Sequence, residues 1–187
     1  MRLAHMYSAA AASATLVLAG ATTAFGAPSP SPAAAPDTVF LQTIHQANLA
    51  EIAAGKDART HAKSACVKQV AAILVRDHTM LDNKGAALAK TKGLSLPNES
   101  TAAQQKQLSA LRSKNGTTGY DTAWLKDQAT SHQQALALID KEVSTGKDTQ
   151  IRAAAKAARP VVAGHLKMVQ GGTCHMPTPS SSASPQR

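Results

Sequence analysis

The stretch that decides the fold reads VKQVAAILVRDHTML and occupies residues 67–81. Its apolar side chains recur at intervals of three, four and seven residues, at Val67, Val70, Ala71, Leu74 and Leu81. This period places them on one face of an α-helix that packs against a core. No segment of the chain alternates apolar and polar residues over the length of a strand, so the sequence predicts an all-α protein.

The helical period extends outward from this stretch in both directions. It predicts helices at about residues 37–54, 57–92, 100–114, 120–145 and 148–169. Asp37 is the expected N-cap of the first helix and Gly55 its expected end. Pro160 should kink the last helix near Ala157 without ending it, because the apolar pattern resumes afterwards. Four long helices, with a short one in the long connection, predict a helical bundle.

The N-terminal 26 residues are typical of a secretory signal peptide. Arg2 supplies a basic start, an apolar stretch follows, and the small residues around Phe25 suit cleavage after Gly26. Cleavage near Ala19-Gly20-Ala21 is an alternative. A membrane anchor is a further alternative, which this short stretch rich in Ala and Gly fits less well.

The remaining boundaries follow from composition. Residues 27–37 are a Pro/Ala/Ser-rich spacer, residues 38–173 form the helical bundle domain, and residues 174–187 are a disordered tail. The mature chain contains no segment apolar enough to span a membrane. We therefore expect a secreted or extracytoplasmic protein, either periplasmic or associated with the cell wall.

The chain is basic, with a formal net charge of +9, and only 3% of its residues are aromatic. Basic patches interleaved with aromatic residues, zinc-finger spacing and recognition-helix patterns are all missing from the sequence, which argues against a nucleic-acid partner. A well-solvated basic surface is the favoured interpretation, and contact with anionic polymers of the cell envelope is the alternative. The oligomeric state is left open.

Cys66 and Cys174 are the two cysteines, and in an oxidising compartment they are expected to form a disulfide. That bond requires the last helix to run antiparallel to the second, as it does when residues 93–119 cross the length of the bundle. A plain up-and-down order would leave the two sulfur atoms roughly 30 Å apart. The plain order would, however, bring His78, His132 and His165 to more similar positions along the bundle axis.

Several motifs in this order resemble the DUF4142 family of exported, ferritin-like helical proteins of bacteria. They are NLAEI at residues 48–52 followed by Gly55, the Asp77-His78 pair, LSLP at residues 94–97, YDTAW at residues 120–124, and Pro160 followed by His165. The resemblance covers about residues 38–170. It implies a ferritin-like four-helix bundle with an additional short helix in the long connection, and it implies no particular activity.

Three histidines that match family positions, His78, His132 and His165, come from three different long helices. Asp121 and Glu51, together with Asp77 and Asp82, are the candidate oxygen ligands. Three imidazoles and a carboxylate would suit a transition-metal ion such as zinc or copper. A di-iron carboxylate site is disfavoured, because the chain has three Glu and none begins a Glu-x-x-His unit.

The sequence favours a non-catalytic envelope or secreted protein with a binding or structural role, in which buried His–Asp pairs link the helices. The alternative is an extracytoplasmic protein that binds zinc, copper or iron through its helix-borne histidines. An enzyme is less favoured, and no catalytic residue is assigned. His45 and His61 are expected to face solvent or a helix seam. His175 lies between Cys174 and Met176, where adventitious copper binding is an alternative to a specific site.

Overall fold

The structure is a computed structural model that describes residues 35–176. These residues form the helices α1 (Pro36–His61), α2 (Ala65–Thr91), α3 (Ala102–Arg112), α4 (Gly119–Thr145) and α5 (Thr149–Val169), and the 3-10 helix η1 (Gln170–Gly172). The all-α prediction is confirmed for this part of the chain, which contains no strand. The predicted signal peptide, most of the spacer and the end of the tail lie outside the described residues.

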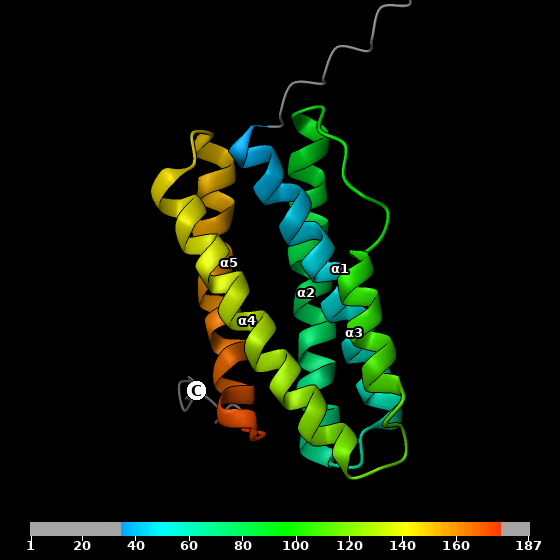
Figure 1. Ribbon diagram of the computed structural model, residues 1–187. Coiled ribbons are helices and arrows are strands. Elements are labelled where there is room, and N and C mark those ends of the chain that lie inside the picture. Colours follow the sequence, from blue (N-terminus) through cyan, green and yellow to red (C-terminus); the bar gives the residue numbers. More distant parts are fainter. Residues whose placement is uncertain (1–34, 177–187) are drawn as a thin grey trace, which may run out of the picture. The chain divides into compact units, whose positions relative to one another are not determined.

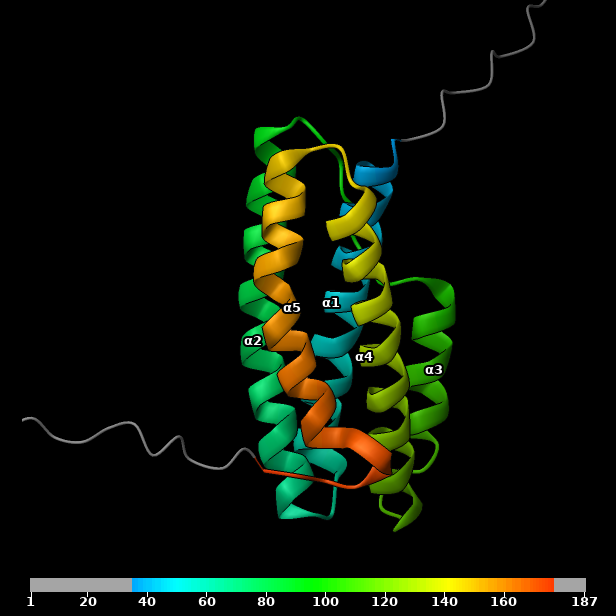
Figure 2. The same cartoon turned by 90° about the vertical axis from the view of Figure 1, so that its left-hand side faces the viewer.

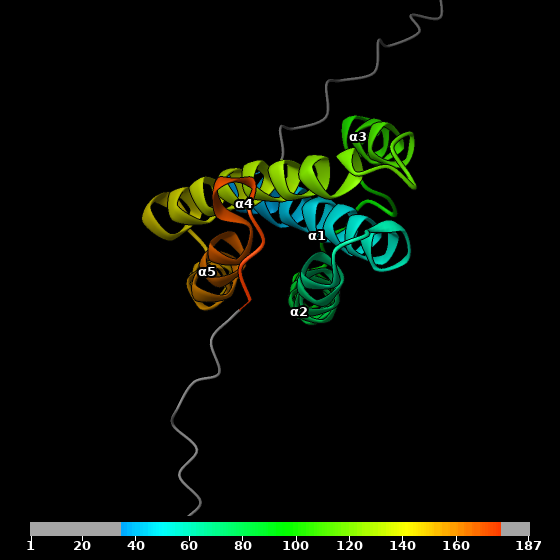
Figure 3. The ribbon, with the colours of Figure 1, turned by 90° about the horizontal axis from the view of Figure 1, so that it is seen from below.

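The four long helices form two antiparallel hairpins, α1 with α2 and α4 with α5 (Figure 1). The connection after α2 runs back along the bundle through α3, so that α4 starts at the end where α2 also starts (Figure 2). As a result α5 is antiparallel to α2, the order that a disulfide requires. Seen from below, α3 lies outside the four long helices, beside α1 and α4 (Figure 3).

The predicted disulfide joins Cys66 in the first turn of α2 to Cys174 beyond η1, with their Cα atoms 6.2 Å apart. The chain after α5 crosses the lower part of the bundle to reach the start of α2 (Figure 2). The backbone N–H of His175 also donates to the carbonyl of Met168 at 2.7 Å. The start of the predicted disordered tail, residues 174–176, therefore belongs to the folded domain.

Gly55 does not end α1, contrary to the prediction; it lies inside the helix and is buried. A Cβ atom at this position would lie 2.6 Å from Cγ2 of Val75 and 3.2 Å from the carbonyl oxygen of Ala71. The glycine therefore lets α1 and α2 approach closely. As a further correction, residues 57–61 belong to α1 rather than to the second helix, which begins at Ala65.

Asp37 is not the N-cap of α1, because its carboxylate is used elsewhere. It accepts hydrogen bonds from the backbone N–H groups of Lys147, at 3.0 Å, and of Asp148, at 2.7 Å. It thereby holds the turn between α4 and α5 against the start of α1. Asp148 caps α5, accepting from the N–H groups of Gln150 and Ile151.

Pro160 lies inside α5, and the helix continues past it to Val169 as predicted. None of the described helices combines the length and the apolar composition needed to cross a membrane. The bundle is held together by apolar packing between amphipathic helices, which supplies most of the stability of such folds.

The core consists of two apolar clusters at different heights along the bundle. The cluster near the disulfide includes Val70, Leu74, Tyr120, Trp124 and Val169. The cluster at the other end includes Phe40, Leu41, Ile139, Ile151 and Val162. Buried polar residues lie between the two clusters: Asn48, Glu51, Asp77, His78, Gln128, His132 and His165. Such a layer opposes folding unless its polar atoms are paired, so its composition needs a functional explanation.

Candidate metal centre

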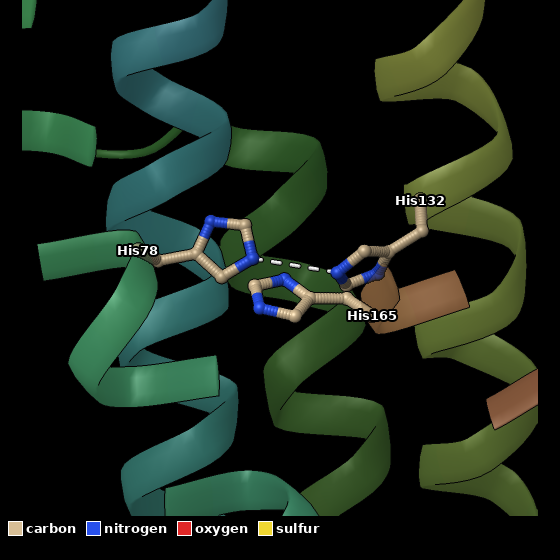
Figure 4. Close-up of side chains that lie close together, drawn as sticks. All are labelled: His78, His132 and His165. Carbon is tan, nitrogen blue, oxygen red and sulfur yellow. Dashed lines mark hydrogen bonds between the residues drawn. The ribbon is translucent and has the colours of Figure 1, made fainter. Parts of the chain in front are cut away.

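Three histidines from three helices meet in this polar layer: His78 of α2, His132 of α4 and His165 of α5 (Figure 4). Their ring centroids are 5.1 to 5.4 Å apart. One nitrogen from each ring lies within 4.8 Å of one nitrogen from each of the others. All three side chains are buried. These are the three histidines that the sequence analysis named as candidate metal ligands.

One nitrogen of each ring faces away from the cluster and has a hydrogen-bond acceptor. The pairs are His78 Nδ1 with Asn48 Oδ1 at 2.9 Å, His132 Nδ1 with the Gln128 carbonyl at 2.8 Å, and His165 Nε2 with Asp77 Oδ2 at 3.0 Å. An acceptor at this nitrogen assigns the N–H to it and leaves the lone pair on the other nitrogen. Hydrogen bonds of this kind orient the histidine ligands of metal sites.

The remaining nitrogens point toward one another. Nε2 of His78 is 3.4 Å from Nε2 of His132, and Nδ1 of His165 has no hydrogen-bond partner among the described residues although it is buried. Metal–nitrogen distances of about 2.0–2.1 Å in a tetrahedral site place two ligand nitrogens roughly 3.3 Å apart. The separation between His78 and His132 therefore suits two ligands of one ion.

The charge state of the cluster also suits a metal ion. The pKa of His78 is held well below its ordinary value by burial, and His132 and His165 lower it further. Burial likewise lowers the pKa of His165, although its hydrogen bond to Asp77 opposes the shift. Neutral imidazole is the form that binds metals. A proton in the cluster would create a buried cation, whereas a metal ion would use the lone pairs and leave the outer hydrogen bonds intact.

Asp77 supports the cluster from outside. Burial raises the pKa of its carboxyl, but hydrogen bonds from Arg76 and His165 outweigh this effect, and the pKa is lowered overall. Arg76 Nε lies 2.7 Å from Asp77 Oδ1. The carboxylate is therefore ionised at neutral pH and is a strong acceptor for the His165 N–H.

Glu51 lies near the cluster but is not part of the triad of ligand atoms. Its carboxyl is buried, and burial raises its pKa. The charge interaction with His132 and hydrogen bonding by the side chains of Gln128 and Ser131 lower the pKa by less than burial raises it. Its Oε2 atom and the Oε1 atom of Gln128 are buried without hydrogen-bond partners among the described residues. Glu51 therefore remains close to the site without a direct ligand role.

Asp121 does not join the cluster, contrary to the sequence-based prediction. Its two carboxylate oxygens accept hydrogen bonds from the backbone N–H groups of Lys63 and Ser64, at 3.0 and 2.7 Å. These hydrogen bonds hold the turn that precedes α2. The turn lies at the end of the bundle where the disulfide is found, away from the histidines. Asp82 is likewise occupied, because its Oδ1 atom lies 2.7 Å from Nδ1 of His45.

The other histidines have separate surroundings. Nε2 of His45 donates to the carbonyl of Pro97 at 2.9 Å and so helps to hold the long connection on α1. His61 contacts Asp57 one turn earlier in α1, and His175 is exposed. Sequence reasoning missed Asn48 as a partner of the cluster. The available signal was its spacing of three from Glu51, which puts both polar side chains on one face of the helix.

A sequence profile described as a domain of unknown function, DUF4142, matches residues 22–171. Among solved structures, the crystal structure of a DUF305 fragment from Deinococcus radiodurans is similar, with a TM-score of 0.65 at 12% sequence identity. The match covers 75% of this chain and 96% of that chain. At such low identity the similarity shows a shared fold alone. No curated protein matches the sequence.

Proposed function

We propose that this chain, which belongs to the DUF4142 family, binds one transition-metal ion through His78, His132 and His165. The observation that carries the proposal is the convergence of three buried imidazole nitrogens, one from each ring, each on a ring whose other nitrogen already has a hydrogen-bond partner. A role confined to linking the helices would leave Nδ1 of His165 buried without a hydrogen-bond partner among the described residues.

The ligand set favours zinc or copper. Imidazole nitrogen suits both ions, whereas Mg²⁺, Ca²⁺ and Mn²⁺ prefer oxygen ligands. Carboxylates take no direct part in the triad, so a carboxylate-rich di-iron centre finds no support here. Both cysteines are joined in a disulfide and offer no thiolate.

The proposal includes a location outside the cytoplasm, after removal of a signal peptide. The disulfide and the basic, apolar N-terminal sequence support this location. It also includes a ferritin-like bundle, which the long connection between the two hairpins supports. Intact-mass measurement of secreted protein tests the location, because a mature chain should begin at Ala27.

The metal proposal is tested by elemental analysis of tag-free protein after dialysis against equimolar Zn²⁺ and Cu²⁺. We expect one equivalent of metal per wild-type chain and loss of that equivalent in His78→Gln and His132→Gln, which preserve side-chain volume. His175→Gln is the matched control, because it removes an exposed histidine beside Met176 and should retain the metal. Wild-type protein without metal, or equal metal content in all three variants, would reject the proposal.

A structural or binding role without metal is the second candidate. The 3.0 Å bond between His165 and Asp77 favours it, because this bond links α5 to α2. The two candidates differ in their response to a chelator. Metal binding predicts that EDTA lowers the melting temperature of wild-type protein but not of His132→Gln, whereas the structural role predicts no effect on either protein.

A further inference from the structure

The faces of α1 and α4 that meet inside the bundle place residues opposite one another in successive layers about one turn apart, and all but one of these residues are polar or aromatic. On α1 these are Asn48, Glu51, Ala54 and Asp57; on α4 they are His132, Gln128, Trp124 and Tyr120. Two of the layers are joined directly, by Trp124 Nε1 donating to the Ala54 carbonyl at 3.2 Å and by Tyr120 donating to Asp57 at 2.7 Å. The helices are antiparallel, so Glu51 and Gln128 share the layer between the histidines and Trp124.

That layer holds two buried oxygen atoms with no hydrogen-bond partner among the described residues, Glu51 Oε2 and Gln128 Oε1. The two residues are only 7% and 3% exposed. Both atoms are acceptors, as are the inward-facing lone pairs of the histidines. An unpaired buried acceptor is costly, so this set of atoms calls for a ligand that supplies hydrogen-bond donors.

A water molecule bound to the metal ion would supply those donors. One helical turn, about 5.4 Å, separates the histidine layer from the Glu51 layer. A metal–oxygen distance of about 2.1 Å followed by an O–H···O distance of about 2.7 Å spans nearly the same length. A tetrahedral ion held by the three histidines would have one position left for a further ligand, as in metal sites that exchange ligands.

The fourth position also has a route to the outside. A cavity of about 520 Å³ is lined near the cluster by Asn48, Glu51 and His132, and it continues between the two hairpins along apolar side chains such as Leu81 and Val161. Exposed residues, among them Lys84, also line it, so the cavity reaches the surface. Small molecules with an apolar body therefore have access to the polar layer.

From these observations we infer a ligand-exchange site that rests on the proposed metal binding. Its fourth metal ligand is a water molecule held by Glu51 and Gln128, and small neutral ligands that carry both a lone pair and an N–H or O–H group replace that water from the cavity. Glu51 and Gln128 act as positioning residues for the exchanging ligand. Ligands without a proton to donate, and anions in particular, bind less well because they face the two acceptors.

The test uses the full mature chain loaded with Co²⁺, whose visible absorption reports coordination number and ligand exchange. Two probes are compared: methoxyamine, a neutral amine at pH 7 that donates N–H groups, and azide, an anion that donates none. We expect wild-type protein to bind methoxyamine more tightly than azide. In Glu51→Gln the ratio of the two affinities should fall by about tenfold or more, because a hydrogen bond to a charged acceptor is lost.

Gln128→Met provides a second variant that removes an acceptor while preserving length, and Gln133→Met, at an exposed position on the same helix, is its control. We expect Gln128→Met to lower the ratio and Gln133→Met to leave it unchanged. Co²⁺ that binds but whose spectrum neither probe alters would refute the exchange site alone. The same ratio in wild-type protein and both site variants would refute the role of Glu51 and Gln128. Failure of Co²⁺, Zn²⁺ and Cu²⁺ to bind would refute the metal proposal as well.

Discussion

Replacement of Gly55 by alanine should push helices α1 and α2 apart. The new Cβ atom would lie 2.6 Å from Val75 Cγ2 and 3.2 Å from the Ala71 carbonyl oxygen, so α1 and α2 must shift apart. Overpacking of this kind costs about 1–3 kcal/mol, and the better helix propensity of alanine returns about 1 kcal/mol. We expect a net loss of roughly 1 kcal/mol in the free energy of unfolding.

Gly85→Ala is the matched control for this prediction. Gly85 also lies inside a helix, but a Cβ atom there would have nothing within 4 Å, so the variant should gain about 1 kcal/mol from propensity alone. The difference between the two variants in urea unfolding therefore isolates the steric contribution, about 1–3 kcal/mol. Adding Val75→Ala should shrink the penalty of Gly55→Ala. Equal stabilisation by the two glycine replacements would show that the close helix contact does not exist.

Three further predictions concern the metal-free protein. Its stability should fall as the pH drops below about 6.5, because the lowered pKa of buried His78 lets the unfolded state bind more protons there; His78→Gln should flatten this slope in unfolding titrations from pH 7.5 to 5. Cys66→Ser with Cys174→Ser should lower the free energy of unfolding by about 5 kcal/mol, given a sequence separation of 108, and a change under 1 kcal/mol in urea melts would contradict the loop-entropy argument. Glu51→Gln should raise the melting temperature at pH 7, because burial raises the pKa of this carboxyl and its ionised form opposes folding; an unchanged or lower value would count against that cost.

The helices could be predicted because they depend on periodicity, whereas the three histidines were singled out because each lies on a different long helix and matches a family position. A long connection that crosses the bundle follows from the disulfide, since Cys66 begins one helix and Cys174 follows another. The disulfide and the histidine cluster looked hard to reconcile from helix lengths alone. They coexist because α5 ends at Val169, and residues 170–174 cover the remaining height to reach α2.

The errors occurred where a partner distant in sequence decides the role of a residue. Asp37 had the position and residue type of an N-cap, but the N–H groups of a turn 110 residues away bind its carboxylate. Asp121 had the type of a metal ligand, but it caps the turn before α2. Gly55 looked like a helix end because glycine commonly terminates helices, and its actual function depends on the side chain of Val75. Local patterns carry no information about these contacts.

The arrangement of hydrogen bonds in the polar layer separates a scaffold from a binding site. A layer that served only to fix helix register would be most stable with every donor and acceptor paired inside it. Here the outward-facing side of each ring is paired, and three of the four unpaired buried side-chain atoms among the described residues belong to this polar layer: Glu51 Oε2, Gln128 Oε1 and His165 Nδ1. All three accept hydrogen bonds or donate lone pairs, so a protein donor added by mutation could satisfy only one of them at a time. A cation that carries a water molecule would pair with all three, which is why we propose ligand binding as the role of these buried polar residues.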